Sequence, residues 1–201
     1  MPNNDMSPFK SALLEFGEFT LELGKVVLIS LAIILPVRYF VVQPFYVNGQ
    51  SMEPTFENNE YLLIDEISYR LDSPKRGDVV VFRYPRDTSK FFIKRLIGLP
   101  GETVRIENGQ VQITNAEHPQ SFTLDEPYLN NNPTLGEYSV SVPEEQYFFL
   151  GDNRDESLDS RVFGPVFKHF VVGRVWLRAF PLSRWAIFGG NTVNGQSPVL
   201  K

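Results

Sequence analysis

The sequence has no cysteine and only two histidines, His118 and His169, among its 201 residues. The lack of cysteine excludes a disulfide framework, a thiolate nucleophile and a cysteine-ligated zinc ion. The metalloprotease motif His-Glu-x-x-His is also missing. With so few histidines, a catalytic base is better sought among other residue types.

Blocks of basic residues are absent as well. The chain carries 19 Lys and Arg against 24 Asp and Glu, which gives a formal net charge of -5. Because phosphate binding needs a concentrated basic patch, no nucleic-acid partner is expected. The hydrophobic content of 42% and the aromatic content of 13% are instead typical of a globular protein.

Long hydrophobic runs are limited to one, residues 26–37, which is apolar apart from Ser30 and is bracketed by Lys25 and Arg38. As a helix these residues rise about 18 Å, less than the hydrocarbon core of about 30 Å. The length becomes adequate when the helix is extended in both directions. We therefore predict a transmembrane anchor over residues 21–43.

Two other interpretations of this segment remain open. A cleavable signal peptide would have a basic start and a small-residue cleavage site, whereas the start here is mixed in charge and Pro44, Phe45 and Tyr46 follow. A buried core helix of a soluble domain is the second alternative. Under the anchor hypothesis, residues 1–20 form an N-terminal tail.

After residue 44 the pattern changes from helical to β. Short runs rich in β-branched and aromatic residues recur, separated by turn residues, and no long helical period appears. We predict strands at residues 61–64, 78–84, 91–97, 102–106, 110–114, 137–142, 146–150 and 171–177.

The domain predicted from these strands covers residues 44–188. Asn108-Gly109 is a type I′ hairpin signal, and it lies in a small β insertion expected at about 103–142. Within that insertion, residues 115–136 show little alternation and are interpreted as a loop or an edge. The polar, Gly- and Asn-rich residues 189–201 are expected to form a flexible C-terminal tail.

Four sequence boxes occur in a specific order along the chain. They are residues 51–56 (SMEPTF), 76–82 (RGDVVVF), 94–102 (KRLIGLPGE) and 151–161 (GDNRDESLDSR). In this order they resemble the conserved boxes of the type I signal peptidases, which are serine proteases with a Ser-Lys dyad. The resemblance covers roughly residues 20–180. It implies that Ser51 is the nucleophile and Lys94 the general base.

The residues around Lys94 suit this role. A serine hydroxyl is a poor nucleophile until a base removes its proton, and a lysine is a base only when it is neutral. Strand alternation places Phe92, Lys94 and Leu96 on one face and Arg95 on the other. Apolar neighbours on its own face would lower the pKa of Lys94 by desolvation.

The resemblance also implies supporting residues. Ser157 matches the residue that hydrogen-bonds and orients the catalytic ammonium, and Asp159 and Arg161 match the pair that braces this region. Met52 matches a position that helps to shape the site. The last box contains two further structural residues, Asp152 and Arg154.

One position departs from part of the family. Some signal peptidases carry a serine two residues before the nucleophile, where its hydroxyl helps to bind the oxyanion. This chain has Gly49 there, as other members do, so the oxyanion is expected to rest on backbone N–H groups such as that of Ser51.

The resemblance implies a mainly β fold: a coiled antiparallel catalytic domain with a small β insertion, preceded by the transmembrane helix. It implies removal of signal peptides from exported preproteins after small residues, without metal or cofactor. The expected partners are preproteins, membrane lipid and the protein export machinery. The expected location is a single-pass membrane protein with its catalytic domain on the extracytoplasmic side, periplasmic or lumenal.

Two rival functions share some of these sequence features. A self-cleaving repressor uses similar Ser-Lys chemistry, but the predicted anchor and the lack of a DNA-binding domain disfavour it. A catalytically silent, membrane-tethered β domain that binds peptides by adding a strand is the alternative from another class. The presence of both Ser51 and Lys94 speaks against that alternative.

Overall fold

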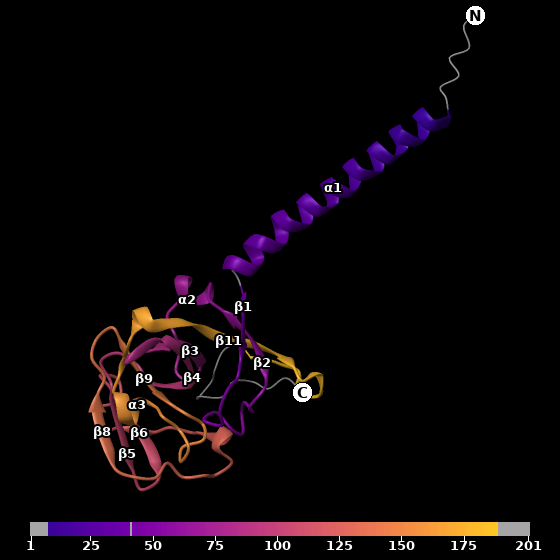
Figure 1. Ribbon diagram of the computed structural model, residues 1–201. Helices are drawn as coiled ribbons and strands as arrows, with labels where there is room; N and C mark the ends of the chain where they lie inside the picture. Colours follow the sequence, from indigo (N-terminus) through magenta and orange to yellow (C-terminus); the bar gives the residue numbers. More distant parts are fainter. Residues whose placement is uncertain (1–7, 41, 189–201) are drawn as a thin grey trace, which may run out of the picture. The chain divides into compact units, whose positions relative to one another are not determined.

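The computed structural model describes the backbone of residues 8–40 and 42–188, and side chains within residues 16–35 and 43–188 (Figure 1). The tail predicted for residues 189–201 lies outside the described residues. The chain divides into two compact units between residues 41 and 42, with one long helix in the first and all the strands in the second.

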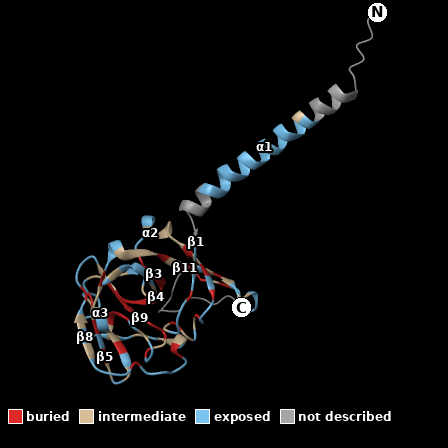
Figure 2. Ribbon diagram, viewed as in Figure 1, coloured by how far each residue is buried: buried red, intermediate tan, exposed pale blue. Residues whose placement is uncertain are grey.

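The helix of the first unit is α1, Pro8–Phe40, with 33 residues. From residue 16 to 35 its large apolar side chains are all exposed (Figure 2). Among the described side chains, the apolar stretch of α1 falls short of the length and hydropathy that a membrane-crossing helix requires. The anchor predicted over residues 21–43 therefore stays a prediction, and its portion 36–42 lies outside the described side chains.

The boundary after the helix differs from the predicted one. The anchor was expected to continue to residue 43, whereas α1 ends at Phe40 and a strand starts at Val42. This strand, β1, forms an edge of the main sheet and pairs with β2. Pro44 lacks an N–H, and an edge strand tolerates it because one side of the strand needs no partner.

The second unit contains an eight-stranded and a four-stranded sheet, and the paired strands in both sheets are antiparallel. The prediction of a mainly antiparallel β fold is thus confirmed, and each strand predicted from the sequence is present. The strands are β1 Val42–Tyr46, β2 Tyr61–Asp65, β3 Val79–Tyr84, β4 Asp87–Gly98, β5 Thr103–Glu107, β6 Gln110–Thr114, β7 Phe122–Thr123, β8 Tyr138–Ser141, β9 Gln146–Leu150, β10 Val166–Phe167, β11 Val171–Phe180 and β12 Ala186–Ile187.

Short helices fill the connections of this unit. Each has three or four residues, so the absence of a long helical period after residue 44 agrees with the structure. They are α2 Ser68–Leu71, η1 Pro127–Leu129, α3 Ser160–Phe163, η2 Lys168–Phe170 and η3 Leu182–Arg184.

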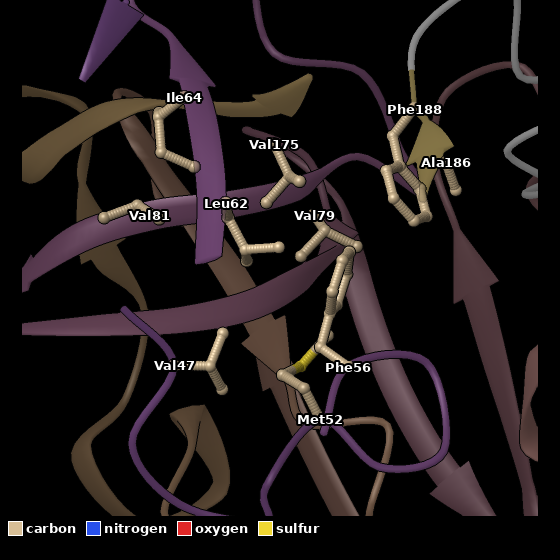
Figure 3. Packing of buried hydrophobic residues seen from close by; sticks show 10 residues of the cluster. All are labelled: Val47, Met52, Phe56, Leu62, Ile64, Val79, Val81, Val175, Ala186 and Phe188. Carbon is tan, nitrogen blue, oxygen red and sulfur yellow. The ribbon is translucent and has the colours of Figure 1, made fainter. Parts of the chain in front are cut away.

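The larger sheet has the order β1-β2-β11-β3-β4-β9-β10, with β12 on β11. Its strand β3 is buried on both faces. Val79 and Val81 join one apolar cluster, which Figure 3 shows around β2, β3 and β11, while Val80 and Phe82 join another. Because both faces of β3 are covered, it reads as a continuous apolar run rather than as an alternating one.

The smaller sheet, ordered β7-β6-β5-β8, is formed by the chain between β4 and β9. Its predicted hairpin is confirmed, because Glu107 pairs with Gln110 and both Asn108 and Gly109 have positive φ. The apolar side chains of this sheet pack with Ile97 and Phe148 from the larger sheet. The segment 115–136, interpreted as a loop, contains β7 and η1.

Candidate active site

Ser51 lies in the turn that connects β1 to β2. Gly49 starts this turn with a φ of +113°, a left-handed conformation that favours glycine, and its N–H donates to Oδ1 of Asn58 at 2.9 Å. No protein atom lies within 4 Å of the position a Cβ would take at Gly49. The glycine is therefore needed for the backbone conformation and not for close contact within the free protein.

Two apolar side chains attach the Ser51 turn to the hydrophobic core. Met52 and Phe56 are buried in the cluster of Figure 3, and the N–H of Phe56 donates to the carbonyl of Met52 at 2.8 Å. Met52 does not line the cleft described below. Its contribution to the shape of the site is to hold the Ser51 turn against the sheet.

Lys94 lies on β4 opposite Val80 and is 4% exposed. Its Nζ donates a hydrogen bond to Oγ of Ser51 at 2.7 Å and another to the carbonyl of Ile93 at 2.9 Å. The ring of Phe92 lies 5.2 Å from the same nitrogen. The structure thus brings together the serine and the lysine that the sequence singled out.

Burial lowers the pKa of Lys94 from 10.5 to about 8, and the nearby carboxylates of Asp159 and Asp152 oppose this shift. The alternation expected for the strand is also present. Phe92 and Leu96 belong to one apolar cluster, on the same face of β4 as Lys94. Near neutral pH an appreciable fraction of this lysine is therefore neutral.

Arg95 points to the other face of β4 but is not at the surface. Its guanidinium forms a bidentate pair with Asp152, at 2.8 Å from Nε and 2.6 Å from Nη2, and both side chains are buried. Oγ1 of Thr55 donates to the same carboxylate at 2.6 Å. Asp152 therefore joins the strand of Lys94 to the turn of Ser51.

The loop after β9, which contains the fourth sequence box, also bonds directly to the Ser51 turn. The N–H of Asn153 donates to the carbonyl of Ser51 at 3.1 Å, and its side-chain amide donates to the carbonyl of Gln50 at 3.1 Å. A Cβ at Gly151 would collide with the hydroxyl of Ser157 and the carbonyl oxygen of Ser51. Only glycine lets these two loops approach so closely.

Ser157 lies beside this contact. Its Oγ is buried and has no hydrogen-bond partner. The bond between Ser157 and the ammonium of Lys94 that the resemblance implies is not among the hydrogen bonds of the described residues. Two of the ammonium N–H groups are directed to Ser51 and Ile93 instead, so the orienting role of Ser157 stays a prediction.

Asp159 and Arg161 form the brace that the resemblance implies. The guanidinium of Arg161 donates to both carboxylate oxygens of Asp159, each at 2.9 Å. Asp159 also accepts from the N–H of Gly151 at 3.1 Å and caps α3. The fully buried carboxylate thereby fixes the loop that lies against Ser51.

A cleft of about 330 Å³ opens beside the serine and the lysine. Most of its walls are apolar, and they come from β1, β3, β4 and the loop after β9. Phe45, Val81, Ile93 and Leu158 are examples, and Gly49, Ser51 and Lys94 also line the cleft. The arrangement provides an apolar slot next to a nucleophile and a base.

Other chemistries find less support in the described residues. Within residues 16–35 and 43–188, no group of three His, Asp or Glu side chains is placed to hold a metal ion. The two histidines do not line the cleft. His118 packs on Phe122, and His169 packs on Phe167 and Phe170.

Several residues that hold the site were not predicted from the sequence. Thr55 and Asn153 lie inside the recognised boxes, and that position was the available signal. Glu126 and Tyr128 lie in the segment interpreted as a loop, yet they contact Arg154 and Arg95. No periodicity or motif of the sequence pointed to them.

Comparison with known proteins identifies the family of this chain. Residues 20–180 match the family described as "Signal peptidase, peptidase S26". The chain is 41% identical over 170 residues to "Probable signal peptidase I-2" of Synechocystis sp., an alignment that covers 82% of this chain and 75% of that protein. It is 35% identical over 182 residues to "Probable signal peptidase I-1" of the same organism, with 87% and 90% covered. It is 36% identical over 173 residues to "Signal peptidase I" of Leptolyngbya laminosa, with 82% of each covered. The chain therefore belongs to the signal peptidase family, peptidase family S26.

Proposed function

We propose that this chain removes N-terminal signal peptides from exported preproteins, with Ser51 as the nucleophile and Lys94 as the general base. Membership of the family makes the chain a signal peptidase in class. The observation that carries the assignment of the two residues is the 2.7 Å contact between a buried lysine amine and a serine hydroxyl beside a cleft.

The geometry suits acyl transfer. Neutral Lys94 accepts the proton of the Ser51 hydroxyl while Oγ attacks the scissile carbonyl, and a tetrahedral intermediate forms. The backbone N–H of Ser51 is our candidate donor to the oxyanion, since Gly49 supplies no hydroxyl. Lys94 then gives its proton to the leaving amine, and a water activated by the same lysine hydrolyses the acyl-enzyme.

The cleft fits short apolar side chains next to the scissile bond. Its volume of about 330 Å³ lies at the lower end for ligand sites. Phe45, Val81 and Ile93 supply apolar walls on which small substrate residues would pack. This supports the expected preference for small residues at the first and third positions before the cleaved bond.

A membrane location is part of the proposal. Residues 26–37 are almost entirely apolar, and the large apolar side chains of α1 between residues 16 and 35 are exposed. Such a surface is unfavourable in water and favourable in lipid. We propose that α1 tethers the chain to the membrane as a single-pass anchor, with the catalytic unit on the extracytoplasmic side near the export machinery.

The proposal is tested by turnover of a preprotein. Detergent-solubilised full chain should release the signal peptide, whereas Ser51→Ala and Lys94→Ala should each abolish release while remaining folded by circular dichroism. Because the two residues act as a unit, the double variant should be no slower than either single variant. Near-normal cleavage by folded Lys94→Ala would reject the lysine as base.

A further inference from the structure

Part of the insertion, the segment between β7 and β8, reaches the two arginines that lie behind the catalytic loops. Its residues Glu126 and Tyr128 flank the start of η1. The segment is fixed at both ends, because the N–H of Leu124 donates to the carbonyl of Val111 at 2.8 Å and that of Thr134 donates to the carbonyl of Gly109 at 2.9 Å. It therefore approaches the larger sheet as part of the small sheet and not as a free loop.

Tyr128 covers the guanidinium of Arg95. The centre of its ring lies 3.8 Å from Cζ of that arginine, which is close for a cation–π contact. Arg95 is the residue that holds Asp152 by two hydrogen bonds. The tyrosine thus closes off, from the side of the insertion, the ion pair that joins the Lys94 strand to the Ser51 turn.

Glu126 holds the neighbouring arginine. Its carboxylate accepts from Nη2 of Arg154 at 2.5 Å and from Nη1 at 3.1 Å, and both side chains are buried. The Nε of Arg154 donates to the carbonyl of Gly151 at 3.0 Å. A side chain at Gly151 would collide with Ser157 and with the carbonyl oxygen of Ser51, so this glycine lies between the two loops.

The two contacts are linked to each other. The hydroxyl of Tyr128 donates to Oε1 of Glu126 at 2.6 Å. Burial raises the pKa of Tyr128, and the charge of Glu126 adds to this effect, so the phenol stays protonated and remains a donor. Two buried arginines therefore meet two carboxylates, Asp152 and Glu126, in a network whose charges balance.

We propose that Glu126 and Tyr128 form a clamp that positions the Ser51–Lys94 pair, acting through Arg95, Asp152 and Arg154. This inference rests on the proposed function, because it assigns a role in the same reaction. The two residues touch no reacting atom and are positioning residues. The insertion thus has a role in catalysis, because it holds the catalytic loops in position relative to each other.

Loosening the clamp has a defined consequence at Lys94. The groups that face Lys94 are Ser51, the ring of Phe92 and the carboxylates of Asp159 and Asp152. A poorly held Arg95 leaves the charge of Asp152 less compensated and admits water between the loops. Both changes favour the ammonium form, so both raise the pKa of Lys94.

The test compares two aromatic residues of the insertion that each lie over an arginine. Tyr128→Leu removes the ring above Arg95. Phe122→Leu is the matched control, because Phe122 lies 5.6 Å from Arg76, and Arg76 forms an ion pair with Glu102. Tyr128→Phe keeps the ring and removes only the hydroxyl. All are made in the full chain in detergent and assayed with one preprotein.

We expect Tyr128→Leu to lower kcat by about tenfold or more with KM within about twofold, as misplaced catalytic groups do. Its ascending pH limb should move upward by about half a unit or more. Phe122→Leu should leave kcat within about twofold and the limb unmoved. Tyr128→Phe should keep kcat within about threefold, since the ring remains above Arg95.

A readout without substrate separates this inference from the proposed function. Titration of the 13Cε resonance of Lys94, assigned by its loss in Lys94→Arg, should show a higher pKa in Tyr128→Leu than in the wild type or in Phe122→Leu. This comparison decides on the clamp even if the preprotein is not cleaved by the wild type, a result that would reject the proposed function alone.

Two results would overturn the clamp. One is a folded Tyr128→Leu with kcat within twofold of wild type and an unmoved Lys94 titration. The other is an equal loss and an equal shift in Phe122→Leu, which would reflect general loosening of the insertion. If Tyr128→Leu does not fold, Tyr128→Met takes its place, because a flexible apolar side chain fills the space without a π face.

Discussion

At the scale of single residues, the chemistry depends on how Lys94 is kept neutral. The residue is 4% exposed, and its pKa is lowered to about 8, chiefly by burial. The carboxylates of Asp159 and Asp152 pull the pKa back upward, so the value reflects a balance between desolvation and charge. The activity should therefore change with pH around the folded pKa of Lys94, and the stability should change between the folded and the unfolded pKa.

The activity should rise with pH through the pKa of Lys94, because only the free amine accepts the serine proton. We expect the ascending limb of kcat/KM for a short peptide near pH 8, measured from pH 5 to 10. Replacing His118 and His169 should leave the limb in place. A limb near pH 6.5, or one that disappears with the histidines, would point to a histidine base.

Stability should follow the same group with a defined sign. The folded pKa of about 8 lies below the unfolded value of 10.5, so between these values the unfolded chain binds more protons than the folded one. The free energy of unfolding should therefore rise from about pH 8 to about 10.5 through this group. Urea unfolding of wild type and Lys94→Met across this range isolates the contribution, which the methionine variant should lack.

Ser157 is the second residue with a testable role. Its buried hydroxyl has no partner, which leaves it available to the ammonium that forms when Lys94 takes the serine proton. We expect Ser157→Ala to lower kcat by roughly 10- to 1000-fold with an unchanged thermal midpoint. An unaltered kcat would remove Ser157 from the site.

At the scale of elements, the site is held by ion pairs between strands and loops that are distant in sequence. Arg95 of β4 and Asp152 after β9 form a pair in which both side chains are almost fully inaccessible. Removing one partner of a buried pair leaves the other charge without compensation. The pair is therefore expected to matter for stability as well as for catalysis.

Asp152→Ala should lower the free energy of unfolding by about 3 to 5 kcal/mol, measured by urea denaturation. Asp87→Ala breaks a surface pair with Lys90 and serves as the control, for which little change is expected. A loss in Asp152→Ala no larger than in the control would show that the buried pair does not hold the loops.

The elements were well predicted where pattern and turn chemistry agree. The strands at 91–97 and 146–150 follow from short runs rich in aromatic and aliphatic residues, and the hairpin at Asn108-Gly109 follows from a two-residue turn. The edge strand β1 was not foreseen because Pro44 interrupts its pattern and the apolar helix leads directly into it.

The candidate site likewise contains residues that the sequence predicts and residues that it does not. Ser51 and Lys94 follow from the boxes, and the structure brings them together. The burial of Arg95 was hidden, because alternation gives the face of a side chain but not what covers that face. Glu126 and Tyr128 were out of reach for a similar reason: a segment without periodicity gives no information on its long-range partners.

At the scale of the whole molecule, the division between residues 41 and 42 predicts where the chain can be cut. Deleting residues 1–41 keeps β1, which pairs with β2, so the remaining unit should fold and cleave a soluble preprotein. Cleavage of a membrane-embedded preprotein should fall, because the tether is lost. Inactivity of the folded truncated form toward both substrates would contradict this prediction.

The truncated unit still carries exposed aromatic side chains. Trp176, Phe180 and Trp185 are 39%, 54% and 54% exposed, and such residues suit a lipid interface. Phe45, by contrast, is only partly exposed and lines the cleft. We expect the truncated form to bind anionic and neutral liposomes in a sedimentation assay, and Trp185→Ser to weaken binding.

The contacts around the nucleophile join residues far apart in the chain. Ser51 meets Lys94 across 43 positions, Arg95 meets Asp152 across 57, and Asn153 meets Gln50 across 103. Such contacts close late in folding, because long loops must be ordered before the contacts form. During synthesis, the Ser51 turn leaves the ribosome about a hundred residues before the loop that holds it. A ribosome-bound chain stalled at residue 150 should therefore be inert, and the protease should acquire its activity only after residues 151–161 have been synthesised and have left the ribosome.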